Sequence, residues 1–265
     1  MNSVVLSARE FLGFEICKAL LEEGSCVYAF DYGEWDSGLY EEKWLEIGRN
    51  ANLTFSPVLE EAMIPEKVTC FIPLFDYATR MDEESIYFLK KDLITFMKSA
   101  RDRIELTVFI APSQLLNDNR DEYKVIYSML QECMEIIKEQ KWQVVYVPTL
   151  FGPWQPEGYL FQQILNEDIK DRFLDDPEDA IFITDAVHTL IKESRKGDNK
   201  SRFLLKSEKE GNWLLCLEAL KKGYKEDRII LEKNLSDVKV IPVAETVSPL
   251  QVFRIQKQRV NDFCK

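Results

Sequence analysis

The chain is poor in the residues that build metal centres and covalent cross-links. Its 265 residues include one histidine, and none of its six cysteines belongs to a Cys-x-x-Cys pair. A structural zinc site needs four such ligands brought together, so no metal site is expected. We expect reduced thiols at all six cysteines, which lie far apart in the sequence: Cys17, Cys26, Cys70, Cys133, Cys216 and Cys264.

Long apolar runs and an excess of positive charge are also missing. Hydrophobic residues make up 46% of the chain, but no run is long enough to span a bilayer. The first ten residues lack the basic and apolar stretches of a secretion signal. With 34 basic and 46 acidic residues the formal net charge is −12, which disfavours binding to nucleic acid. We therefore expect a cytoplasmic protein that binds neither nucleic acid nor membrane.

Short apolar runs do alternate with amphipathic segments of helix length. This alternation predicts an α/β fold in which helices cover both faces of a parallel sheet of about six or seven strands. The strands predicted in the first part of the chain are residues 2–6, 26–31, 52–58, 68–75, 105–112 and 142–150. The main predicted helices are residues 14–24, 83–103 and 122–141.

The alternation loosens beyond Phe151. Residues 151–158 are rich in turn formers, and the elements that follow are short and mixed. We therefore predict two domains, with residues 1–150 as the main domain and residues 151–265 as a smaller C-terminal α/β lobe that completes a cleft. The acidic stretch 171–180 is interpreted as a solvated loop, because nothing near it in the sequence supplies convergent metal ligands.

Residues 7–13, with the sequence SAREFLG, join the first predicted strand to the first predicted helix. In a dinucleotide-binding protein this junction is a phosphate loop, whose glycines permit a tight turn and a close approach of the backbone to the pyrophosphate. Only Gly13 is present in this stretch. The sequence therefore indicates a phosphate loop that has lost most of its glycines.

Gly13, Asp31, Tyr123 and the stretch VPTLFGPWQPEG at 147–158 occur in an order that resembles the extended short-chain dehydrogenase/reductase family. This is the group of nucleotide-sugar epimerases and dehydratases. The resemblance extends over nearly the whole chain. It implies a Rossmann-like, doubly wound parallel sheet in residues 1–150 that binds NAD or NADP, and a substrate lobe in residues 151–265.

The family's phosphate loop has the pattern Thr-Gly-x-x-Gly-x-x-Gly. When its last glycine is matched to Gly13, Ser7 and Glu10 stand at the two earlier glycine positions. A carboxylate about 4 Å from a phosphate costs roughly 1 to 4 kcal/mol for each charge pair, so we expect any NAD to bind weakly. The cofactor-binding residues that the resemblance implies are Ser7, Arg9, Glu10, Phe11, Leu12, Gly13 and Asp31.

Two charged residues in this set each allow two interpretations. Arg9 either compensates the phosphate charge beside the N-terminal amides of the helix, or is a solvated loop residue, which we favour. Asp31 either accepts hydrogen bonds from the adenosine ribose of NAD or forms a turn. In the first case it would also repel the additional phosphate of NADP.

The family's chemistry needs a tyrosine and a lysine four residues later, on the same face of a helix. Tyr123 stands at the tyrosine position, but Tyr127 stands at the lysine position, and Lys124 lies about 100° away around the helix. The catalytic Ser or Thr position falls on Pro112. Ser113 is one residue away, and in an extended segment its side chain would point to the opposite side. Two of the three catalytic positions are therefore lost.

These substitutions leave three hypotheses for the function, and whether the chain is an enzyme stays open. The first is a catalytically silent or feeble protein that keeps a weakened nucleotide site and acts by binding a nucleotide or partner. The second is an active NAD-dependent oxidoreductase or epimerase that uses Tyr123 with non-standard help. The third is an interaction protein without a cofactor, whose cleft is filled by side chains. We expect His188 to have a packing or surface role.

The resemblance also bears on oligomeric state. Members of the family dimerise through the helices that follow strands four and five, which correspond to residues 89–103 and 123–141 of this chain. A homodimer through these helices is therefore one expectation, and a monomer is the alternative.

Overall fold

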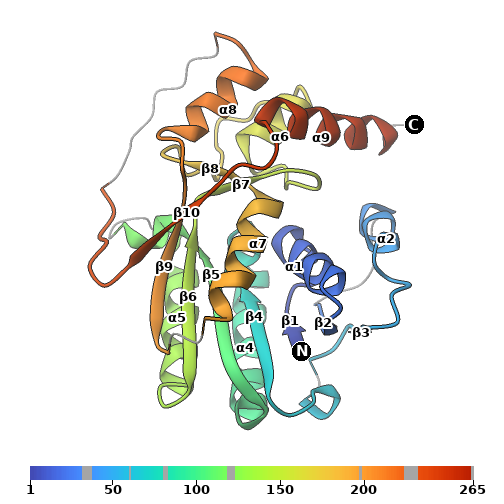
Figure 1. The fold of residues 1–265 in the computed structure, drawn as a ribbon, viewed down its shortest axis with the longest axis vertical. Helices are drawn as coiled ribbons and strands as arrows, with labels where there is room; N and C mark the ends of the chain where they lie inside the picture. The colour runs from blue at the N-terminus through green and yellow to red at the C-terminus, as the bar shows by residue number, and fades with distance from the viewer. Residues whose placement is uncertain are drawn as a thin grey trace.

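The computed structural model of the chain describes residues 1–31, 38–59, 61–79, 83–117, 123–196, 199–223 and 232–263. Its main feature is an eight-stranded sheet with the order β10-β9-β6-β5-β4-β1-β2-β3, in which every neighbouring pair is parallel (Figure 1). The strands are β1 Asn2–Val5, β2 Cys26–Phe30, β3 Leu53–Ser56, β4 Val68–Pro73, β5 Ile104–Pro112, β6 Lys141–Val147, β9 Ser201–Ser207 and β10 Lys239–Val243.

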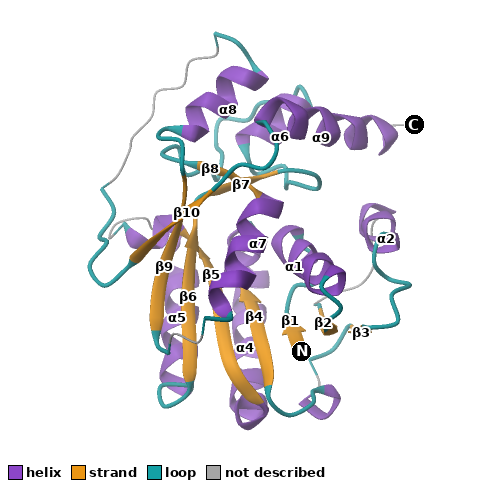
Figure 2. Ribbon diagram, viewed as in Figure 1, coloured by secondary structure: helices purple, strands orange, loops and turns teal. Residues whose placement is uncertain are grey.

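Helices cover both faces of this sheet. α1 (Phe11–Glu22) and α7 (Ile183–Ser194) lie on one face, and α4 (Glu83–Ala100) and α5 (Lys124–Ile136) lie on the other (Figure 2). Each face has its own core of buried apolar side chains. Every residue of β4 is buried, which is typical of a strand with helices on both sides. The doubly wound α/β fold predicted from the sequence is confirmed.

The chain changes direction at β1, which lies between β2 and β4. The connections that leave β1 and β4 therefore diverge at the carboxyl ends of these strands, where doubly wound sheets bind their ligands. The first connection is the loop that precedes α1. The second is the short helix α3 (Leu74–Ala78). The prediction that strand four continues to residue 75 was wrong, because the strand ends at Pro73 and α3 begins at once.

A smaller cluster of elements lies at the top of the view in Figure 1. β7 and β8 pair there in a short parallel sheet, and aromatic side chains of this cluster pack around Phe151. Its elements are β7 Thr149–Phe151, α6 Leu160–Leu165, β8 Ala180–Phe182, α8 Asn212–Leu220 and α9 Pro249–Phe263. The chain beyond Phe151 also supplies α7, β9 and β10 to the main layers, so the sheet has two strands more than the first part of the chain provides. The division at residue 150 stays a prediction.

The remaining elements that the structure describes are one helix and three short turns. α2 (Gly38–Leu45) lies beside α1 in Figure 1, and three short 3-10 turns occur at Glu61–Met63, Arg101–Arg103 and Ser113–Leu116. None of the helices in the described ranges is long and apolar enough to cross a membrane.

Candidate functional site

The loop between β1 and α1 makes its turn without the family's first two glycines. Ser7 adopts the left-handed backbone region at φ 51°, and the amide of Glu10 donates to the Ser7 carbonyl oxygen over 2.9 Å. A Cβ atom added to Gly13 would lie 2.1 Å from that same oxygen. Glycine is therefore required at position 13, because the first turn of α1 packs directly against the loop.

The N-terminus of α1 binds a carboxylate of the protein itself. The amide nitrogens of Leu12 and Gly13 donate to Oδ1 and Oδ2 of Asp76, over 2.9 and 2.8 Å. Asp76 lies in α3 and is fully buried. In dinucleotide-binding folds the amides at this helix end, together with the helix dipole, hold the pyrophosphate. The Asp76 carboxylate therefore occupies the anion position of α1.

Lys43 closes the loop from the side of α2. Its Nζ donates to the carbonyl oxygens of Arg9 and Glu10, over 2.6 and 2.8 Å, and its side chain is buried. Burial lowers the pKa of Lys43, and the carboxylates of Glu10 and Asp76 oppose this change. Two effects raise the pKa of Asp76: burial, which is the larger, and repulsion from Glu10. Its two amide partners and Lys43 lower this pKa.

Arg9 and Asp31 form a buried pair beside this loop. The backbone amide and Nε of Arg9 donate to Asp31 Oδ2, over 2.8 and 3.2 Å, and the two side chains are 4% and 2% exposed. The Arg9 guanidinium also lies over the rings of Phe55 and Tyr40, at 5.3 and 5.8 Å. The expectation that Arg9 is a solvated loop residue was wrong, because Asp31 and the aromatic rings bind it inside the fold.

Three further residues of the predicted cofactor set lie at the start of α1. Phe11 and Leu12 are its first two residues, and their side chains are buried in the core. Glu10 precedes the first residue of α1 and makes no side-chain cap to the helix, and Tyr40 donates its hydroxyl to Glu10 Oε1 over 3.2 Å. The structure thus brings all seven predicted residues to one region, which is already engaged with Asp76 and Lys43. Their role in binding a cofactor stays a prediction.

Asp76 and Lys43 were missed by the sequence analysis. Asp76 follows a fully buried strand by three residues, at the end of the sheet where ligands bind. That position is a usable signal, because a carboxylate there faces the N-terminus of the neighbouring first helix. Lys43 lies in an amphipathic helix whose packing the sequence did not indicate.

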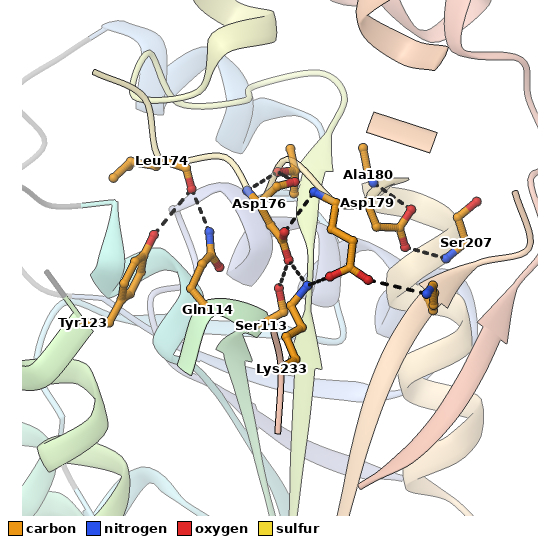
Figure 3. A network of polar contacts seen from close by, with 12 residues as sticks. Ser113, Gln114, Tyr123, Leu174, Asp176, Asp179, Ala180, Ser207 and Lys233 are labelled. Carbon is orange, nitrogen blue, oxygen red and sulfur yellow. Dashed lines mark hydrogen bonds and ion pairs between the residues drawn. The ribbon is translucent and has the colours of Figure 1, made fainter. Parts of the chain in front are cut away.

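Tyr123 and Tyr127 do not share one environment. Tyr123 directly precedes α5 and is buried, whereas the Tyr127 side chain is 51% exposed. The Tyr123 hydroxyl donates to the carbonyl oxygen of Leu174 over 3.4 Å, and Gln114 Nε2 donates to the same oxygen over 2.9 Å (Figure 3). Lys124 is exposed. The phenol therefore faces a backbone carbonyl of the same chain.

β5 ends at Pro112, and a 3-10 turn begins at Ser113. The extended geometry expected at Ser113 was therefore wrong. The Ser113 hydroxyl is buried and donates to the carboxylate of Asp176, next to Gln114 and Tyr123 in Figure 3. The Ser113 hydroxyl, one residue after the family position, is therefore bonded to Asp176, whereas the Tyr123 hydroxyl is directed at Leu174.

The acidic stretch 171–180 is not a solvated loop, because three of its carboxylates are buried. Asp175 accepts hydrogen bonds from Trp213 Nε1 and the Leu160 amide, both over 2.8 Å. Asp179 accepts the Ser207 amide over 2.8 Å. Burial raises the pKa of Asp175 to about 6 and that of Asp179 to about 7. The sequence analysis missed these partners, since they come from other parts of the chain.

Within the described residues, no group of three or more histidine, cysteine or acidic side chains is placed to hold a metal ion. His188 is exposed on α7. The five cysteines in the described ranges are free thiols, and Cys264 lies outside those ranges. Burial raises the pKa of Cys133 to about 12, and it raises the pKa of Cys17, Cys70 and Cys216 further still.

Solved structures with this fold are numerous, whereas no protein-family model and no curated protein sequence matches the chain. UDP-glucuronic acid 4-epimerase from Bacillus cereus, solved with UDP-glucuronic acid and NAD, superposes with a TM-score of 0.68 at 14% identity and covers 99% of this chain and 100% of its own. UDP-glucose 4-epimerase from Thermotoga maritima, solved with UDP-glucose, has a TM-score of 0.66 at 15% identity over 100% of both chains. dTDP-glucose 4,6-dehydratase from Bacillus anthracis, solved with NAD, has a TM-score of 0.67 at 13% identity and covers 99% of this chain and 97% of its own. The chain therefore has the Rossmann-like fold of NAD-dependent epimerases and dehydratases.

The residues of this chain do not fit NAD in the arrangement described. The amides that would hold the pyrophosphate are bonded to Asp76, and the carboxylate that would hold the ribose is bonded to Arg9. A dinucleotide could bind here only if the side chains of Asp76 and Arg9 moved away from these partners.

Proposed function

We propose that the chain is a catalytically silent protein with an epimerase and dehydratase fold, and that it acts by binding a partner. The observation that carries this proposal is the Asp76 carboxylate on the amides of Leu12 and Gly13. Hydrogen bonds to a charged group are worth about 1.5 to 3 kcal/mol each. Asp76 is tethered to the chain, so it competes with a free phosphate without the entropic cost of association.

Any dinucleotide therefore binds feebly. It must displace Asp76, bring two phosphate charges close to Glu10, and separate Arg9 from Asp31. If one does bind, NAD is preferred over NADP, because the Asp31 carboxylate would face the additional phosphate. The hypothesis of a protein without a cofactor, whose cleft is filled by side chains, gains the most support from these contacts.

The residues around Tyr123 argue against the family's chemistry. An unperturbed phenol has a pKa near 10 and is a poor base at neutral pH. The position four residues later, where the family has its lysine, holds Tyr127, which is half exposed. The Tyr123 hydroxyl is already directed at the Leu174 carbonyl oxygen.

We propose a second copy of the chain as the partner. Tyr87 and Phe88 in α4 and Tyr127 in α5 are 65%, 55% and 51% exposed, and these helices pack side by side on the outer face of the sheet. Large exposed aromatic side chains are typical of interfaces.

We also propose a cytoplasmic location, which the free thiols of the five described cysteines support.

The test of catalytic silence is a panel of nucleotide sugars and simple carbonyl compounds, each incubated with the protein and NAD or NADP. Absorbance of the reduced nicotinamide follows oxidation and reduction, and product analysis detects epimerisation without net redox change. We expect no turnover above the background without protein. Robust turnover that disappears in Tyr123→Phe would contradict the proposal, and turnover that persists in this variant would indicate a different active site.

The partner is tested separately by sedimentation velocity of the wild-type protein and of Tyr87→Ser/Phe88→Ser. We expect a dimer that dissociates in the double variant, with the wild-type fold retained by circular dichroism. A wild-type monomer at all accessible concentrations would rule out the second copy as the partner and leave another protein as the candidate.

A further inference from the structure

Residues 174–178, which we name the closing segment, cover the region around Tyr123. On the side of the smaller lobe, this segment is fixed by Asp175, whose carboxylate accepts from Trp213 Nε1 and the Leu160 amide. These contacts are buried and tie the segment to α6 and α8. The lobe therefore holds one side of the closing segment.

On the other side, the closing segment supplies hydrogen-bond acceptors for polar side chains that follow β5. The carbonyl oxygen of Leu174 accepts from Tyr123 and Gln114, and the carboxylate of Asp176 accepts from Ser113 (Figure 3). Three donors at the end of the sheet are thus satisfied by one short piece of the same chain. We name this group, Ser113, Gln114 and Tyr123, the covered corner.

Lys233 pairs with two carboxylates of the closing segment, whose backbone at Asp176 is also hydrogen-bonded to the Thr149 hydroxyl. Lys233 Nζ lies 2.6 Å from Asp176 Oδ2 and 2.7 Å from Glu178 Oε2, and its side chain is 7% exposed. Lys233 belongs to a different stretch of chain, which leads into β10. The next residue, Asn234, donates its amide to the Leu116 carbonyl oxygen over 3.0 Å. Lys233 therefore clamps the closing segment from a stretch of chain outside α6, α8 and the covered corner.

Removing the charge of Lys233 would leave two carboxylates close together. Asp176 and Glu178 would repel one another, and Asp179 adds a further buried carboxyl group beside them. A buried ion pair contributes little net stability compared with an apolar pair, but the loss of one partner leaves an uncompensated buried charge. The repulsion would act on the closing segment, whereas the strands of the main sheet would lose no contact.

We infer that Lys233 and the closing segment form a latch, in which Lys233 clamps Asp176 and Glu178 so that residues 174–178 cover Ser113, Gln114 and Tyr123. Release of the clamp uncovers this corner while the sheet stays folded. The inference concerns access to the corner, so it holds whether or not the chain turns over a substrate.

The experiment compares Lys233→Met with Lys206→Met. Methionine keeps the length of the side chain and removes its charge, and Lys206 is a matched control because it pairs with the same Glu178 at 3.5 Å from a more exposed position. Hydrogen exchange is followed by mass spectrometry. We expect amides in residues 113–117 and 174–178 to exchange at least about 10-fold faster in Lys233→Met, with β1 and β4 unchanged. The control should exchange as the wild type does.

A second measurement reports on the side chain. Tetranitromethane nitrates accessible tyrosines, and the half-exposed Tyr127 provides an internal reference four residues from Tyr123. We expect the ratio of Tyr123 to Tyr127 nitration to rise at least about 10-fold in Lys233→Met.

Faster exchange spread evenly over β1, β4 and the closing segment would overturn the latch, because it would mean that Lys233 serves global stability alone. Unchanged exchange in residues 113–117 and 174–178 would also overturn it. If Lys233→Met does not fold, Asp176→Asn removes the charge that binds Lys233 with little change in shape. For that variant too, exchange that rises evenly over the sheet, or that stays unchanged in residues 113–117 and 174–178, would overturn the latch.

Discussion

The phosphate-loop region and the covered corner are both filled by the chain itself, but in different ways. At the phosphate loop, the side chains of Asp76 in α3 and Lys43 in α2 bond to the backbone of the loop and of the first turn of α1. At the covered corner, a backbone segment that leads to the smaller lobe lies over the side chains of Gln114 and Tyr123.

This difference implies different stabilities. Asp76 and Lys43 are both buried, so displacing them disturbs the core. The closing segment is an irregular stretch fixed by the contacts of Asp175, by hydrogen bonds between Thr149 and Asp176, and by Lys233, and we propose that it separates locally. We therefore interpret the phosphate-loop region as permanently closed and the covered corner as reversibly closed.

The largest effect is expected when the buried pair beside the phosphate loop is broken. Arg9→Met leaves the Asp31 carboxylate buried without its cation, which should lower the free energy of unfolding by about 3 to 5 kcal/mol. Urea denaturation measures this change. Lys138→Met is the control, because both side chains of its pair with Glu135 are exposed and such a pair contributes little to stability.

Adding Asp31→Asn to Arg9→Met should restore part of the lost stability, since no buried charge then remains unpaired. A loss in Arg9→Met as small as that in Lys138→Met would show that the pair is not part of the folded core.

The next effect is a dependence of stability on pH. The pKa values of Asp175 and Asp179 are raised by burial, to about 6 and about 7, above the ordinary value of an aspartate. The folded protein therefore binds these protons more tightly than the unfolded chain. The stability that this proton binding contributes is fully present below a pH of about 4, the pKa of an aspartate in the unfolded chain. It is lost as the pH rises through the folded values near 6 and 7.

We expect the melting temperature to fall between pH 5 and pH 8. Differential scanning calorimetry across this range measures the fall, and Asp179→Asn should flatten it because asparagine does not titrate. A melting temperature that rises over the same range in the wild type would contradict the prediction.

A smaller effect is expected from Glu10→Gly. Removing this carboxylate reduces the repulsion of a phosphate, so affinity for NAD should rise several-fold. The gain should be smaller than that from removing Asp76, because Asp76 and not Glu10 is bonded to the amides of α1. Isothermal titration calorimetry measures the affinity, and Glu10→Gln separates the effect of charge from that of the backbone. An unchanged affinity in both variants would show that Glu10 does not limit binding.

The smallest effect is expected at the covered corner itself. Tyr123→Phe removes one hydrogen bond of 3.4 Å to Leu174, so the free energy of unfolding should fall by less than about 1 kcal/mol. Urea denaturation beside the wild type measures it. A loss comparable to that of Arg9→Met would mean that the corner is as firmly closed as the phosphate-loop region.

Much of the fold could be predicted from the sequence, because strands such as β4 and β5 are mostly apolar runs and the helices α4 and α5 are amphipathic. The end of β4 at Pro73 and the return of β9 and β10 to the main sheet were not foreseen. Both depend on how distant parts of the chain pair, and a local pattern does not record that.

The sequence predicts which residues of the candidate site lie together, but it does not predict which other groups bond to them. The structure brings Gly13 and Asp31 to one region, because their spacing follows from the geometry of a strand, a loop and a helix, and the function of this region stays a prediction. The partners that fill it are far away in sequence: Asp76 lies 64 residues from Leu12, and Leu174 lies 51 residues from Tyr123. A single sequence shows which groups are missing from a site, but it does not show which groups have replaced them.

The central claim is that Asp76 occupies the phosphate position of α1, and titration of NAD into the wild type and Asp76→Ala tests it most directly. Asp92→Ala, at an exposed position in α4, is the control, and Asp76→Asn serves if the alanine variant does not fold. We predict no saturation of the wild type or the control in the micromolar range and at least about 10-fold tighter binding by Asp76→Ala, which corresponds to about 1.4 kcal/mol. Micromolar binding of NAD by the wild type, unchanged or weakened in Asp76→Ala, would contradict the account.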